Sequence, residues 1–357
     1  MICLAILGDK AYSSLRVYRS FAFHSPGSMR NLESLPFSDR LHRIGYLLKH
    51  TVTVVGRDAD IVTPWAWMVG YAVVMTTAFF VGVVGAVLQS FAIGAAGFGV
   101  AVAMFFYKYL FYNYREVGQS WLVYETISGR DRSYADAKAE AKRRKSGVWK
   151  LAGLDLLMAY LVSQRDNESK GIFSWLVNLF LAGLEEVWDL VNHYMLPAIA
   201  IDGLTLTDGV TKMKDLRNQV PETLTGVFGI DFIGRVVGQV TGALYFVLVL
   251  VAVGGSYFGA GVLPEAFTFT FANNPIGGGP LVLNVLPLIA GLYVGKVAGV
   301  IFERTVTSVK VIYFTIFYTQ ITHPDRIADD LRPQLVQYLR MEEAPTAPAG
   351  TEEVAPA

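Results

Sequence analysis

The chain of 357 residues contains a single cysteine, Cys3, and only five histidines. One cysteine cannot form a disulfide within the chain, and it cannot build a metal site of several thiolates. Charged residues make up 17% of the chain, whereas an ordinary soluble domain has about 25%. Lysine plus arginine equals aspartate plus glutamate at 30 each, so the charge balance predicts no nucleic-acid partner.

The sequence also lacks the short patterns that mark known kinds of active site. No HExxH zinc motif, CxxC pair, nucleophile elbow or kinase signature occurs in it. The glycine-rich stretch 273–280 contains no lysine or arginine, so it predicts turns rather than a phosphate loop. These absences favour a protein without enzyme activity, and we predict no cofactor and no metal site.

Long apolar runs are what the chain has in abundance, with 53% hydrophobic residues and a mean hydropathy of +0.41. A helix that crosses a membrane needs about 20 mostly apolar residues. Four segments meet this requirement: Trp65–Leu88, Phe91–Phe111, Val237–Tyr257 and Leu281–Phe302. Only Gln89 and Ser90 separate the first two segments, which predicts a tight helical hairpin.

Two less apolar segments leave the number of crossings open. Val148–Val162 contains Asp155, and Ile172–Ile201 contains several charged residues. Lysine and arginine are frequent in residues 1–62 and 113–150 and absent from 258–280, and basic loops tend to stay on the cytoplasmic side. The pattern predicts six spans, or four spans plus a re-entrant or interfacial pair within 148–201. Both termini are then cytoplasmic.

The predicted fold is therefore an all-α, polytopic membrane bundle with amphipathic helices on the cytoplasmic side. Residues 1–34 are expected to form an N-terminal extension that is disordered or precedes the true start at Met29. Residues 35–325 are expected to form the helical membrane domain. Residues 326–357 form an amphipathic segment and a tail rich in alanine, proline and glutamate, a composition typical of disorder.

Two helices are predicted outside the spans. Residues 38–57 repeat apolar side chains at helical spacing, and this helix either lies on the inner membrane surface or packs on the protein's own loops. Residues 133–146 begin with a capping-box pattern of Ser133 and Asp136, include a Glu140–Arg144 pair, and are expected to end at Gly147. Their basic cluster either attracts anionic lipid headgroups or serves as a topology signal on a solvated face, and we favour the latter.

A polar face inside the apolar region is the strongest candidate for a functional site. Glu185, Asp189 and His193 lie at i, i+4 and i+8, so they share one helix face, which Glu186 extends. Ionisable residues at membrane depth are costly and mark functional sites. The cluster can bind a metal, line a polar path, or be satisfied structurally, and the last alternative is favoured. Elsewhere in the apolar region, Asp155 and Lys296 are expected to form an ion pair, or Lys296 pairs with a glutamate.

Small residues form a stripe on the last predicted span. Gly291, Gly295 and Gly299 follow one another at intervals of four, a spacing that lets a second helix approach closely. The stripe favours packing within the chain over dimerisation, because a multi-span protein offers several internal partners.

Several features together resemble uncharacterised prokaryotic multi-pass membrane proteins known only as a domain of unknown function. They are an amphipathic helix before a paired hairpin of spans, a basic loop, Val187-Trp188 followed by His193 to Ala198, an amphipathic stretch over 207–223, and an aromatic end at 311–318. The resemblance covers residues 35–325 and implies no particular activity, substrate or cofactor.

The sequence thus predicts a structural, accessory or scaffold protein of the cytoplasmic membrane. The alternative is a transporter or channel whose polar path is lined by Glu185, Asp189 and His193. The expected partners are the lipid bilayer, a second copy of the chain or other membrane proteins.

Overall fold

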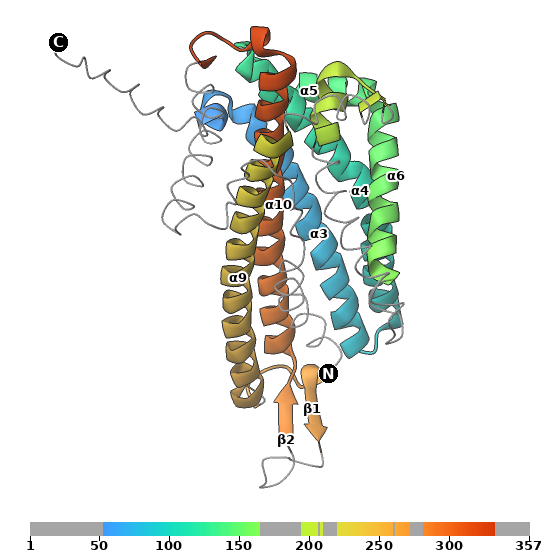
Figure 1. The fold of residues 1–357 in the computed structure, drawn as a ribbon. Helices are drawn as coiled ribbons and strands as arrows, with labels where there is room; N and C mark the ends of the chain where they lie inside the picture. Colours follow the sequence, from blue (N-terminus) through green and yellow to red (C-terminus); the bar gives the residue numbers. More distant parts are fainter. Residues whose placement is uncertain are drawn as a thin grey trace, which may run out of the picture. The chain divides into compact units, whose positions relative to one another are not determined.

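The computed structural model describes residues 53–164, 194–205, 208–209, 220–259, 261–271 and 281–332, all within one compact unit. Most of these residues are helical (Figure 1). The predictions for the N-terminal extension, for the C-terminal tail and for the polar face at Glu185–His193 fall on residues outside this part of the chain.

Four of the described helices are long and apolar enough to cross a membrane. They are α3 (Val62–Val87), α4 (Phe91–Ile127), α9 (Val220–Phe258) and α10 (Leu286–Thr322). Each predicted span falls on one of them. Helices α4 and α10 have 37 residues each. At 1.5 Å per residue each is about 55 Å long, whereas the hydrocarbon core of a bilayer is about 30 Å thick.

Glycines bring α3 and α4 into backbone contact. The turn between them is short, and Gln89 adopts the left-handed backbone conformation there, with a φ of 54°. A Cβ atom added to Gly97 would lie 2.3 Å from Gly82 N, and one added to Gly85 would lie 2.3 Å from Gly94 N. Neither position can accommodate a side chain, so the four glycines set the distance between the two helices.

A short β-hairpin joins α9 to α10 and departs from the all-α prediction. Strand β1 (Thr268–Phe271) pairs antiparallel with β2 (Leu281–Asn284). Residues from Leu281 were expected to begin the last span, but α10 begins at Leu286. Asn284 precedes the N-cap residue Val285, and its Oδ1 accepts a hydrogen bond from Leu286 N at 3.1 Å, which satisfies an N–H of the first turn.

The small-residue stripe of α10 faces α9. A Cβ on Gly295 would lie 2.2 Å from Tyr245 Cδ2, and one on Gly291 would lie 2.7 Å from the Ala252 Cβ. Gly299 lies more loosely against Thr241, at 3.9 Å. Helix α9 therefore occupies the face of α10 that the spacing of these glycines singled out.

Two shorter helices follow α4. Helix α5 (Tyr134–Arg143) begins with the Ser133–Asp136 capping box, and Arg144 pairs with Glu140 at 3.0 Å. Helix α6 (Lys145–Gln164) begins one residue later. Gly147 was expected to stop the first helix, but it lies inside α6. The chain continues helically because Arg144 O accepts a hydrogen bond from Val148 N at 3.2 Å.

Burial divides the bundle into two halves. In the most apolar 18-residue stretch of each long helix, only 11–28% is buried within the protein. In contrast, the buried side chains of α4 and α10 concentrate in residues 112–127 and 308–320. We call residues 53–61, 112–148, 194–205 and 308–332 the head, and the described remainder of α3, α4, α9 and α10 the apolar half. The described residues of both hairpin turns, at 88–90, 259, 261–271 and 281–285, lie at the end of the bundle opposite the head (Figure 1).

Candidate functional site

Of the candidate polar residues in the apolar region, Asp155 and Lys296 belong to the described structure, whereas the predicted polar face does not. Glu185, Glu186, Asp189 and His193 lie outside the described residues. Asp155, on α6, accepts a hydrogen bond from Asn113 Nδ2 at 2.7 Å. Among the described residues, no ion pair within 4.0 Å joins Asp155 to Lys296. The Asn113–Asp155 bond instead links α6 to α4 near the boundary between the two halves.

Cations on the apolar half lie over aromatic rings. Lys108 Nζ is 4.0 Å from the centre of the Phe105 ring, and Arg304 Cζ is 4.3 Å from the centre of the Tyr112 ring. Lys296 is exposed on α10, two helical turns before Arg304. A ring face attracts a cation where water is scarce, so these contacts lower the cost of charge on an apolar helix surface.

One polar cluster of the head joins two segments that are distant in sequence. Asp202 Oδ1 lies 2.7 Å from His323 Nε2, and Asp202 Oδ2 accepts a hydrogen bond from the Tyr318 hydroxyl at 2.5 Å. Both side chains of the ion pair are largely shielded, with 15% of Asp202 and 27% of His323 exposed. The carboxylate therefore fastens residues 194–205 to the end of α10.

Local backbone chemistry places the two ends of this cluster. Residues Ala198–Asp202 form a π-helical turn after Pro197, and Gly203 ends it in the left-handed conformation with a φ of 64°. His323 is the C-cap of α10, and Pro324 follows it. Proline lacks the N–H that would continue the helix, so the chain turns at His323 and its ring reaches Asp202.

Aromatic rings enclose the cluster. The Tyr194 ring lies edge to face with the Tyr318 ring at 5.6 Å, and the Tyr124 ring lies 5.9 Å from the His323 ring. Tyr194 is 5% exposed, and its hydroxyl has no hydrogen-bond partner in the described part of the chain. Burial raises the pKa of Tyr194 above its ordinary value, so this phenol stays protonated at neutral pH.

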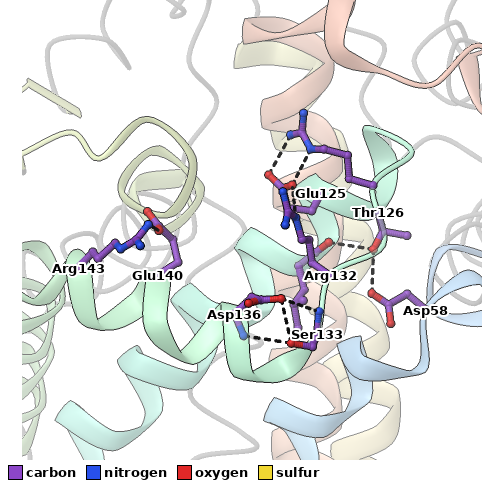
Figure 2. Close-up of polar contacts among 10 residues, drawn as sticks. Asp58, Glu125, Thr126, Arg132, Ser133, Asp136, Glu140 and Arg143 are labelled. Carbon is purple, nitrogen blue, oxygen red and sulfur yellow. Dashed lines mark hydrogen bonds and ion pairs between the residues drawn. The ribbon is translucent and has the colours of Figure 1, made fainter.

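A second polar set fixes the loop between α4 and α5. Figure 2 shows Glu125 between two arginines: Arg130 Nε lies at 2.6 Å and Arg132 Nε at 3.5 Å from the carboxylate. The hydrogen bond from Arg130 to Glu125 raises the pKa of Arg130. Next to it, the Thr126 hydroxyl donates to Asp58 Oδ2 at 3.1 Å, which ties the end of α4 to the chain before α3.

Side-chain hydrogen bonds also cross the core between α4 and α10. Gln119 Nε2 donates to Ser308 Oγ at 2.6 Å and to Ile61 O at 2.9 Å. The Ser120 and Thr315 hydroxyls lie 2.8 Å apart. Buried polar groups that bond to each other favour one arrangement of the helices, because any slip leaves them unpaired.

The polar clusters described above join separate segments of the chain through hydrogen bonds and ion pairs. Within the described ranges, no group of three histidine, cysteine, aspartate or glutamate side chains could hold a metal ion. The Asp202–His323 pair is accompanied by a tyrosine hydroxyl that donates to the carboxylate, and no serine or cysteine among the described residues bonds to the histidine. The cluster is thus suited to fastening two segments of the chain together.

Sequence reasoning did not find Asp202, Tyr318 or His323. The local signals were present, since Asp202-Gly203 and His323-Pro324 both mark helix ends. Nothing in one sequence reveals that two helix ends 121 residues apart meet.

Comparison with known proteins adds no relative: no family model, no curated protein and no solved structure matches this chain.

Proposed function

We propose that this chain is a multi-pass protein of the cytoplasmic membrane, and that it acts as a structural or accessory element that presents the head at the inner face. One observation supports this most strongly. Helices α4 and α10 run without interruption from the exposed apolar half into the buried core of the head. A continuous helix transmits position and orientation, so the spans and the head form one unit.

Aromatic and cationic side chains beside the head are of the kind found where a protein meets lipid headgroups. Trp67 is 53% exposed, and Arg115 Cζ lies 5.3 Å from the centre of its ring. Trp65 Nε1 donates to Thr305 Oγ1 at 3.2 Å, so Thr305 of α10 lies at the same height in the bundle as Trp65 of α3. Tryptophan and arginine are favoured at the lipid headgroups, because one end of each is apolar and the other is polar.

The distribution of charge supports the orientation. The described head carries Arg57, Arg115, Arg130, Arg132 and the basic cluster of α5. At the opposite end, the described residues of the two hairpin turns include no lysine or arginine and one acid, Glu265. Basic segments stay on the cytoplasmic side, so the head is assigned to the inner face.

The accessory function is tested by purification from membranes in mild detergent after crosslinking in the cell. We expect another protein, or a second copy of the chain, to copurify at fixed stoichiometry. Substitution of Glu125 by Gln in the head should release it, whereas Gly99→Leu in the apolar half should not. A chain that is always recovered alone and as a monomer would contradict the proposal.

Transport is the second candidate, and three polar residues on α4, α6 and α10 favour it. Asn113 and Asp155 form a hydrogen bond near the boundary, and Lys296 lies ten residues into α10. The polar face at Glu185, Asp189 and His193 would extend such a path. Liposomes that contain the purified protein should show no proton, potassium or anion flux above protein-free liposomes. A flux that Lys296→Ala or Asp155→Asn abolishes would replace the accessory function with transport.

A further inference from the structure

One exposed surface on α6 combines a large aromatic side chain with lysines. Trp149 is 59% exposed, while its neighbours Val148 and Leu151 are fully buried against the head. Lys145 lies one helical turn before Trp149, and Lys150 follows it, and both lysines are exposed. We call Lys145, Trp149 and Lys150 the Trp149 patch.

The basic residues 142–145 lead into the patch, and their side chains differ in whether they contact the protein or solvent. Arg144 turns inward: a Cβ on Gly203 would lie 1.8 Å from its Nη1, and its Nη2 pairs with Glu140 at 3.0 Å. Arg143 also pairs with Glu140, at 3.1 Å. Lys145 and Lys150 form no ion pair with any described residue. The outward lysines therefore carry positive charge that the head itself does not neutralise.

An apolar stripe continues from the patch along α6. Gly153, Leu156, Leu157 and Tyr160 are exposed and recur at helical spacing after Trp149. The opposite side of α6 packs on α4, since Val148 and Leu151 share a core cluster with Val117. Helix α6 is not among the four membrane-length apolar helices, yet Leu156, Leu157 and Tyr160 are exposed on it.

The level of the patch matches the boundary at the head. Val148 packs with Val117, and Asp155 bonds to Asn113, so α6 runs antiparallel to this part of α4. Trp149 therefore lies level with residues 114–117 of α4. Arg115, within that stretch, contacts Trp67, a second exposed tryptophan among the described residues. The lysines of the patch thus lie where lipid headgroups meet the protein.

We propose that the Trp149 patch binds the headgroups of anionic phospholipids, with the acyl chains lying along the stripe that ends at Tyr160. This inference rests on the proposed membrane function. Two ammonium groups that pair with no described residue complement a phosphate, and the indole ring favours the interface between headgroup and acyl chain. The occupant is a phospholipid rather than a free phosphate, because the charge and the apolar stripe are continuous.

The test is native mass spectrometry of the full chain in detergent, titrated with phosphatidylglycerol or with phosphatidylcholine of the same acyl chains. The protein should bind phosphatidylglycerol preferentially. The double variant Lys145→Gln/Lys150→Gln should weaken that binding about 30-fold, as expected for two lysines near a lipid surface. The matched control Arg326→Gln/Arg332→Gln removes the same charge from other exposed side chains of the head and should leave the preference unchanged.

A second readout examines the tryptophan. Brominated phosphatidylglycerol should quench the fluorescence of the protein more strongly than that of its Trp149→Phe variant. Equal binding of both lipids, or an equal loss in the patch and control variants, would overturn the proposal. Retention in membranes after an alkaline wash separates the two hypotheses: a protein that is retained but shows no lipid preference keeps the membrane function and loses the lipid site.

Discussion

Asp202 and His323 lie 2.7 Å apart although 121 residues separate them in the sequence. The pair joins the π-helical turn after Pro197 to the C-terminal end of α10, and α10 itself continues into the apolar half. A displacement of α10 along its axis would pull His323 away from Asp202. The contact therefore links the packing of the head to the position of the apolar helices.

Substitution of Asp202 by Asn should destabilise the head. The change removes the charge that His323 and Tyr318 share, and hydrogen bonds to a charged group contribute about 1.5–3 kcal/mol. Chemical unfolding in detergent measures the difference. Asp329→Asn is the matched control, because Asp329 is 96% exposed and should change stability by less than about 0.5 kcal/mol. Equal effects of the two variants would show that the Asp202 contacts contribute nothing.

A leucine at position 97 should separate α3 from α4. Even a Cβ there would lie 2.3 Å from Gly82 N, and that contact is to backbone, which cannot move aside. Overpacking typically costs about 1–3 kcal/mol, and more where only backbone can yield. Gly99 lies two residues away with nothing within 4 Å of an added Cβ, so Gly99→Leu is the control. We expect a lower thermal midpoint for Gly97→Leu alone. If Gly99→Leu lowers it equally, the glycine contact between α3 and α4 is not what matters.

The glycine stripe of α10 packs against α9, so we expect it to contribute to stability and not to the oligomeric state. Gly295→Leu should disturb the contact with Tyr245 and lower the thermal midpoint, while the oligomeric state stays the same. Gly254→Leu on α9 should have little effect on the midpoint, because nothing lies within 4 Å of a Cβ there. Light scattering of the detergent-solubilised protein measures the mass. A Gly295→Leu protein that remains stable but dissociates would instead place the stripe between two copies of the chain.

Trypsin should report on the loop between α4 and α5. It cleaves after arginine, and both Arg130 and Arg132 are held by Glu125. Glu125→Gln weakens these contacts by removing the charge, so cleavage after Arg130 and Arg132 should become several-fold faster. Asp325→Asn changes an exposed carboxylate that contacts Arg326 only weakly, at 3.8 Å, and serves as the control. Unchanged cleavage in Glu125→Gln would mean that the backbone alone orders the loop.

The sequence was most informative where one local signal determines one local structure. The four apolar runs predicted α3, α4, α9 and α10, and the spacing of Ser133 and Asp136 predicted the capping box of α5. Helix ends were predicted less well. Residues after Phe111 are polar, which suggested a loop, but the head buries those side chains and α4 continues to Ile127.

Contacts between distant segments could not be read from the sequence. The Asn113–Asp155 and Asp202–His323 bonds depend on how α6 and the segment after Pro197 pack on α4 and α10. Asp155 was singled out because a carboxylate in an apolar run is costly, and that argument does not say which neighbour satisfies it. The polar face at Glu185, Asp189 and His193 stays a prediction.

Cysteine accessibility tests most directly whether the two ends of the bundle lie on opposite sides of a membrane. Cys3 is the only cysteine, so a Cys3→Ser background leaves one thiol for each site. Gly261→Cys lies beside the β-hairpin and Asp131→Cys lies in the head, and both positions are exposed. A membrane-impermeant maleimide should label Gly261→Cys in intact cells and Asp131→Cys only after the cells are permeabilised. Equal labelling of both positions in intact cells would contradict the account.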